Sequence, residues 1–192
     1  TGIINTVSTG INKFSESSGS GAADMQKTEF ESVIYPLIVT ETKDFESVSD
    51  LGNEELINIA VWELVINGKK SVFEDQETGD ILFPQDQMTY IVEKLFGEDM
   101  KLDHSDSGIG DIIISYDKKK KQYIIPKDTY LYSYYPKVTD IAETDDTYTV
   151  YADCYKSTPP WNSGKADPEK RVMVTLKKTQ DYYCLLYTSD AA

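Results

Sequence analysis

The stretch TYTVYADCYK (residues 147–156) decides the fold class, because its apolar and polar side chains alternate with a period of two. This alternation is typical of a β-strand that has one buried face. We expect four side chains to face a core: Tyr148, Val150, Ala152 and Cys154. We expect four others to face the opposite side: Thr149, Tyr151, Asp153 and Tyr155.

Four further segments carry strand-like patterns: DIIISYD (111–117), KQYIIPK (121–127), YYPKVTDIAET (134–144) and KRVMVTLKKT (170–179). Short polar turns join some of them, among them TDD (144–146) and the lysine run 118–121. Strands that are joined by short turns pair antiparallel. The second half of the chain therefore predicts an antiparallel meander, with Val172, Val174 and Leu176 on one face of its last complete strand.

Three segments before these strands have helical periodicity, and they cover residues 27–42, 53–70 and 84–97. In the first helix we expect Pro36 to cause a kink or to end its first part. In the second helix one apolar face is predicted, made of Leu56, Ile59, Ala60 and Leu64. Helices followed by antiparallel strands predict an α+β fold, in which about three helices pack on a curved sheet of about five to six strands.

This order of elements resembles the NTF2-like and cystatin-like rolls, in which helices lie across a bent antiparallel sheet. Several stretches also resemble a family of secreted or lipid-anchored proteins of gut Firmicutes: FESVIYPLIV, INIAVWELVINGK, YSYYPKVTDIAETDDTYTV and VMVTLKKTQDYY. This family brings no known activity, so the resemblance implies a location on the outer side of a bacterial membrane and assigns no functional residue.

The first 26 residues contain SESSGSGAAD, a composition that is typical of a flexible tether. We predict a tether over residues 1–26, downstream of an anchor that lies upstream of this sequence, and a single α+β domain over residues 27–183. An interdomain linker would fit the same composition equally well.

The last nine residues, CLLYTSDAA (184–192), resemble the translated transposon-end adapter that is used to build sequencing libraries. We therefore predict that residues 184–192 are a non-native tail of a metagenomic fragment. We expect Leu185 to Ala192 to pack poorly and to lack a consistent inward face, beyond what a strand extension makes by accident. The alternative is a frayed natural C-terminus. Without Cys184, the only natural cysteine is Cys154, which we expect to be a small buried apolar residue.

The net charge of −14, from 19 basic and 33 acidic side chains, restricts the classes of molecule that the chain can bind. Such a field repels phosphate backbones, so nucleic-acid binding is disfavoured. The run Lys118 to Lys121 is most simply a solvated turn between two strands. No apolar run reaches the length of a membrane span, so a membrane is expected as a partner only through a missing upstream anchor.

A metal site is the first candidate chemistry, because DHSDSGIGD (103–111) places oxygen-bearing side chains at the spacing of a calcium loop. The candidate ligands are Asp103, Ser105, Ser107 and Asp111. Ile114 stands where a bidentate Glu is required, and two of the four ligands are neutral. We therefore favour an ordinary loop between a helix and a strand and expect no metal or other cofactor.

An aromatic ligand site is the second candidate. Tyr130, Tyr132 and Tyr134 recur with a period of two, and Trp161 lies in the loop STPPWNSG. Rings on one face of a strand stack on sugar rings or on a partner's apolar groups. The competing interpretation, which we favour, is that these rings pack against the core.

Catalysis has little support in the sequence. The only histidine, His104, lies in a loop of Gly, Ser and Asp residues, so nucleophilic catalysis by Ser or Cys has no evident base. Phosphate-binding Gly-rich loops and the CxxC and HExxH motifs are absent from the sequence. We therefore predict a non-catalytic extracytoplasmic binding or interaction module of unknown ligand, for which a carbohydrate or a protein at an aromatic face is the candidate partner. The alternative is a roll-type enzyme with a small-molecule pocket between its helices and its sheet.

Overall fold

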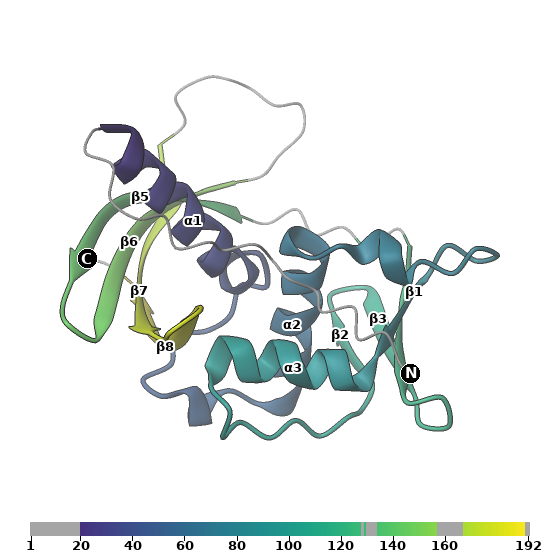
Figure 1. Cartoon of the computed structure of the whole chain (residues 1–192). Helices are drawn as coiled ribbons and strands as arrows, with labels where there is room; N and C mark the ends of the chain where they lie inside the picture. Colours follow the sequence, from purple (N-terminus) through teal and green to yellow (C-terminus); the bar gives the residue numbers. More distant parts are fainter. Residues whose placement is uncertain (1–19, 128, 130–133, 157–166, 191–192) are drawn as a thin grey trace.

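A computed structural model of the chain describes residues 20–127, 129, 134–156 and 167–190 (Figure 1). Its helices are α1 (Ser20–Val39), α2 (Asn53–Asn67) and α3 (Gln85–Phe96), with short 3-10 turns η1 (Val48–Asp50) and η2 (Lys70–Phe73). The strands in the first half are β1 (Ile81–Pro84), β2 (Ser107–Ile109), β3 (Ile112–Asp117) and β4 (Gln122–Ile125). Those in the second half are β5 (Tyr134–Glu143), β6 (Thr147–Lys156), β7 (Lys170–Lys178) and β8 (Tyr183–Asp190). The predicted α+β class is confirmed.

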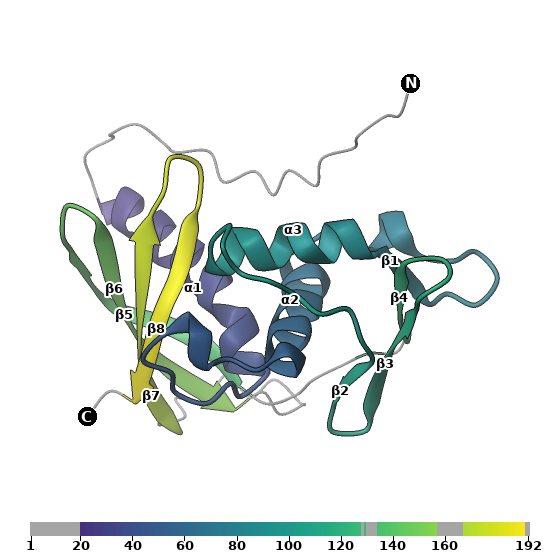
Figure 2. The same ribbon diagram turned by 90° about the horizontal axis from the view of Figure 1, so that it is seen from below.

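The strands of the described residues form two antiparallel sheets of four, so the expectation of a single curved sheet is wrong. The order in one sheet is β1-β4-β3-β2, and the order in the other is β5-β6-β7-β8. Ile81 on β1 pairs with Ile125 on β4, so the far side of the β3–β4 hairpin is occupied by an early strand. Because this pairing satisfies the backbone of β4, β5 begins a sheet of its own. The helices lie between the two sheets (Figures 1 and 2).

The β5–β8 meander has the predicted faces. Val150, Ala152 and Cys154 on β6 are buried, whereas the side chains between them are half-exposed. Val150 and Ala152 pair across to Val174 and Val172 on β7, so the inward rows of both strands meet. The alternation of the sequence therefore identifies both the buried side of this sheet and its outer side.

Helix α2 is buried on all sides, which corrects the prediction of one apolar face. Every residue from Leu56 to Leu64 is buried, including the polar Asn58 and Glu63. A helix that is apolar nearly all round belongs in the interior, and α2 lies between the two sheets (Figure 1). The side chain of Asn58 is satisfied there, since it donates to the carbonyl of Gly108 and accepts from the hydroxyl of Ser107.

Helix α1 begins at Ser20, inside the segment that we predicted as a tether, and it continues through Pro36 to Val39. The expectation that Pro36 ends the first part of the helix is therefore wrong, whereas the alternative of a kink stays a prediction; the helix ends one turn later. Proline has no N–H, so the carbonyl of Ser32 lacks its helical donor. The side-chain amide of Asn67, at the end of α2, donates to this carbonyl at 2.8 Å. The proline is thus tolerated because a second helix supplies the missing hydrogen bond.

We expect Asn67→Ala to lower the free energy of unfolding by about 1–3 kcal/mol, because it leaves the Ser32 carbonyl without this donor. Part of that loss should disappear in a Pro36→Ala background, where the new N–H of residue 36 pairs with Ser32. Asn67 also donates to Glu63 at 2.6 Å, and that contribution should persist in both backgrounds. Urea unfolding of the four proteins of this cycle measures the coupling. Equal losses in both backgrounds would contradict the compensation.

Strand β8 contains residues 184–190 of the predicted tail, and the expectation of poor packing is wrong for its buried residues. Leu185 is fully buried and Cys184 is 6% exposed. Residues of β8 pair with β7 over its length, and Thr188 on the other edge forms a bridge with Phe45. The physical reason is that β7 presents an unpaired edge and buried apolar residues that favour any neighbouring strand. The resemblance to an adapter stays a prediction about the nucleotide sequence.

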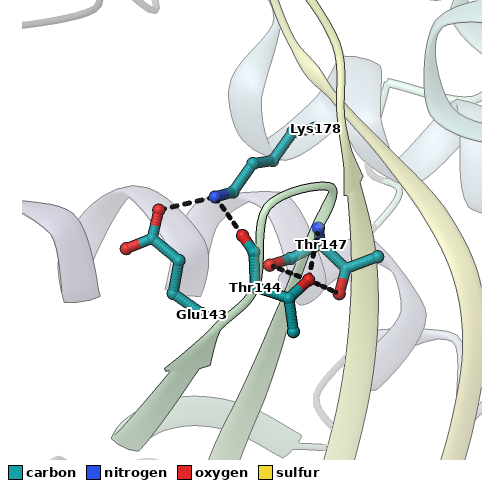
Figure 3. A network of polar contacts seen from close by, with 4 residues as sticks. All are labelled: Glu143, Thr144, Thr147 and Lys178. Carbon is teal, nitrogen blue, oxygen red and sulfur yellow. Dashed lines mark hydrogen bonds and ion pairs between the residues drawn. The ribbon is translucent and has the colours of Figure 1, made fainter.

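The β5–β6 turn is held by a polar network around Lys178 (Figure 3). The ammonium of Lys178 donates to the carboxylate of Glu143 at 2.6 Å and to the carbonyl of Thr144 at 2.5 Å. Thr144 and Thr147 close the turn through their hydroxyls, which lie 2.8 Å apart. The hydrogen bond from Lys178 lowers the pKa of the Glu143 carboxyl. The network fixes the register of β5, β6 and β7 at one end of the sheet.

Candidate functional site

The outer face of the β5–β8 sheet is the side opposite the hydrophobic core, and α1 approaches it at the β5 edge, where Glu31 pairs with Lys137. We define it by seven side chains: Tyr135, Lys137, Tyr151, Asp153, Tyr155, Arg171 and Met173. Buried core residues such as Val138, Ala152 and Val172 alternate with them along the strands, so strand alternation directs these seven away from the core. In Figure 2, α1 crosses behind this sheet, and α2 and α3 lie beside it toward the other sheet.

Three tyrosines give the outer face its aromatic character. Tyr135 and Tyr155 are cross-strand partners whose rings stack at 5.7 Å with an angle of 26° between their planes. Tyr151 lies on the same strand as Tyr155 and pairs across to Met173. All three tyrosines are half-exposed. The face therefore offers partly exposed aromatic surface.

A polar row crosses the sheet between the aromatic positions. Asp153 pairs in register with Lys137 on one side and with Arg171 on the other. The Arg171 Nε donates to an Asp153 carboxylate oxygen at 2.9 Å. Lys137 is paired with Glu31 of α1 at 3.0 Å. The charges of Arg171 and Asp153 thus neutralise each other, as do those of Lys137 and Glu31. The polar groups of this row lie next to the tyrosine rings.

The predicted aromatic site is only partly described by the structure. Tyr130, Tyr132 and Trp161 lie outside the described residues. Tyr134 lies on the core side of β5, packed against the hydrophobic core and under the ammonium of Lys170, which is 4.9 Å from the ring centre. Tyr134 is therefore on the opposite side of the strand from Tyr135.

The residues of the predicted metal loop hold the fold together. Ser107 is buried and donates to Asn58, and the backbone of Asp103 exchanges hydrogen bonds with the side chain of Asn53. Ser105 lies 3.2 Å from the same Asn53 amide, whereas Asp111 is exposed. Over the described part of the chain, no three His, Cys, Asp or Glu side chains are grouped to hold a metal ion.

His104 has specific partners, which the loop composition did not predict. Its Nδ1 lies 2.9 Å from the Tyr123 hydroxyl, and its Nε2 lies 3.2 Å from the Thr89 hydroxyl. The imidazole also stacks on Tyr116 at 5.4 Å. This cluster joins the loop after α3 to α3 itself and to β4. The ring is thereby used to fix the loop in place.

Partial burial lowers the pKa of His104 from its ordinary value of 6.5, against the opposing effect of Asp86 and Asp103. Because the folded-state pKa is lowered, the stabilising contribution of the neutral His104 ring is fully present above the unfolded-state pKa. It is lost as the pH falls through the folded-state pKa. We expect urea midpoints to fall more for the native chain than for His104→Gln between about pH 7 and about pH 5. Parallel pH profiles for the two proteins would contradict this prediction.

A small pocket lies between α2 and α3, and its volume is about 20 Å³. Leu64, Phe83 and Ile91 line it together with the ion pair of Glu63 and Lys94, whose charged atoms are 3.7 Å apart. This volume suits a water molecule. The space between α2 and α3 is therefore too small for an organic substrate.

Comparisons of the chain with protein-family models, with curated proteins and with solved structures found no match. In the described residues, no helix combines the length and the hydropathy that crossing a membrane requires. The candidate site therefore depends on geometry alone. Sequence alternation had placed Tyr151 and Tyr155 on the correct side of β6. It gave no sign of where the helices dock on the sheet, so these residues were not chosen as a site.

Proposed function

We propose that this chain is a non-catalytic binding module whose ligand docks on the outer face of the β5–β8 sheet. The observation that carries the proposal is the partly exposed set Tyr135, Tyr151 and Tyr155 on a sheet whose opposite side is packed into the core. Aromatic side chains supply large contact area at small entropic cost, which suits them to recognition. The 20 Å³ pocket gives no comparable support to a small-molecule enzyme.

Two finer expectations belong to this proposal. Location outside the bacterial cytoplasm is supported by the resemblance to secreted or lipid-anchored proteins. A roll of the NTF2-like or cystatin-like kind is supported only for α1 with β5–β8, where the helix contacts β5 and β6. Both are consistent with a module that presents one sheet face to its surroundings.

The test places a photo-reactive phenylalanine analogue at position 151 and exposes the protein to bacterial surface material under illumination. We expect cross-linked products that do not form when the analogue replaces Tyr90, which is 44% exposed on α3. Mass spectrometry of the cross-linked products then shows whether the captured material is carbohydrate or protein. Identical products from both positions, or none from position 151, would reject the outer face as the docking surface.

A further inference from the structure

We propose that the ligand of the outer face is an extended, uncharged polysaccharide chain. This inference rests on the proposed function and adds the chemical class of the ligand. It follows from three properties of the face: the spacing of its rings, the placement of its hydrogen-bonding groups, and its charge.

The spacing of the rings favours a chain over a single sugar. Tyr151 and Tyr155 are four residues apart on β6, which corresponds to about 13 Å along an extended strand. Tyr135 widens the platform at Tyr155, and Met173 widens it at Tyr151. One sugar ring covers one of these two platforms, whereas an extended oligosaccharide reaches both. The 37% exposed Tyr187 on β8 prolongs the row, but the inference rests on β5, β6 and β7.

The polar groups are placed for hydroxyl recognition. Asp153 lies on β6 between the two aromatic platforms, where its 14% exposed side chain accepts a hydrogen bond from the Nε of Arg171. The Arg171 side chain is 60% exposed, so its terminal amino groups face solvent as donors. A sugar presents apolar C–H groups on one face and hydroxyls at its edge. Such a molecule matches flat rings with adjacent donors and acceptors better than an apolar protein anchor, which needs a deep pocket.

Charge complementarity excludes polyanions. The chain carries a net charge of −14, which repels uronate or sulfated polymers at long range. At the site itself, Arg171 is neutralised by Asp153 and Lys137 by Glu31. No excess positive charge is left among these four groups to attract an acidic chain. An uncharged polymer meets neither repulsion nor the desolvation of an unpaired charge.

The experiment is native gel electrophoresis of the full chain through gels that contain soluble polysaccharides. The neutral probes are β-glucan, xylan and galactomannan, and the anionic probe is polygalacturonate. We expect retardation by at least one neutral polymer and competition by its oligosaccharides but not by its monosaccharide. Tyr151→Ala and Tyr155→Ala should each weaken binding about tenfold, whereas Tyr155→Phe keeps the ring and should retain binding.

Tyr90→Ala removes an exposed tyrosine outside the face and serves as the matched control. Urea midpoints of all variants show that they are folded. Retardation by polygalacturonate alone, or by no polysaccharide, overturns the inference. If position 151 then still captures a protein partner, the proposed function stands with a different ligand class. If it captures nothing, both proposals fail.

Discussion

Lys94→Met is expected to lower the free energy of unfolding by about 3–5 kcal/mol, because it leaves the Glu63 carboxylate buried without its cation. The Glu63 and Lys94 side chains are only 9% and 13% exposed, and Glu63 lies on the helix that is buried all round. The double variant Glu63→Gln/Lys94→Met should recover most of the loss, since an uncharged amide costs far less to bury. Chemical unfolding of the single and double variants measures both values.

Lys137→Met is the matched control, because it removes a lysine from a Lys–Glu pair at the surface. The Lys137 side chain is 58% exposed, and exposed pairs contribute about 0–1 kcal/mol. Similar losses for Lys94→Met and Lys137→Met would show that the interior of the α2–α3 contact is hydrated. The ion pair would then not be buried as described.

Leu185→Ala should destabilise the chain by about 2–5 kcal/mol, the usual range for truncating a fully buried leucine. Leu186→Ala is the internal control. The side chain of Leu186 is only half-buried, so its truncation should destabilise the chain clearly less. Thermal unfolding of the two variants compares them directly. Equal and small effects would show that residues 184–190 do not pack beside β7. That result is the one expected for a non-native tail.

The sequence predicted those parts of the fold that depend on local pattern. The two faces of β6 follow from a period of two, and Gly97, with φ of 106°, ends α3 as its position suggested. The division into two sheets was missed, because the pairing of Ile81 with Ile125 joins distant segments and leaves no local sign. The tolerance of Pro36 was missed for the same reason, since the donor on Asn67 belongs to another helix.

The candidate site was predictable in its residues but not in its accessibility. Alternation assigned Tyr151 and Tyr155 to the face opposite Cys154, and both lie there. Whether a second layer covers that face depends on where the helices dock, which is a property of the whole chain. His104 shows the converse, because a polar loop composition concealed its contacts with Tyr123 and Tyr116.

The separation of α1 from its partner strands has a consequence for biosynthesis. Phe30 of α1 packs against Tyr148 of β6 and Tyr183 of β8, which follow it only after α2, α3 and the whole first sheet have been made. While the chain is growing, α1 can pack on α2, but the part of its apolar side that contacts the β5–β8 sheet has no final partner. Such intervals expose growing chains to aggregation and to chaperone binding. Solubility during translation thus depends on how quickly the last four strands emerge, and slow translation of that region should favour misfolding.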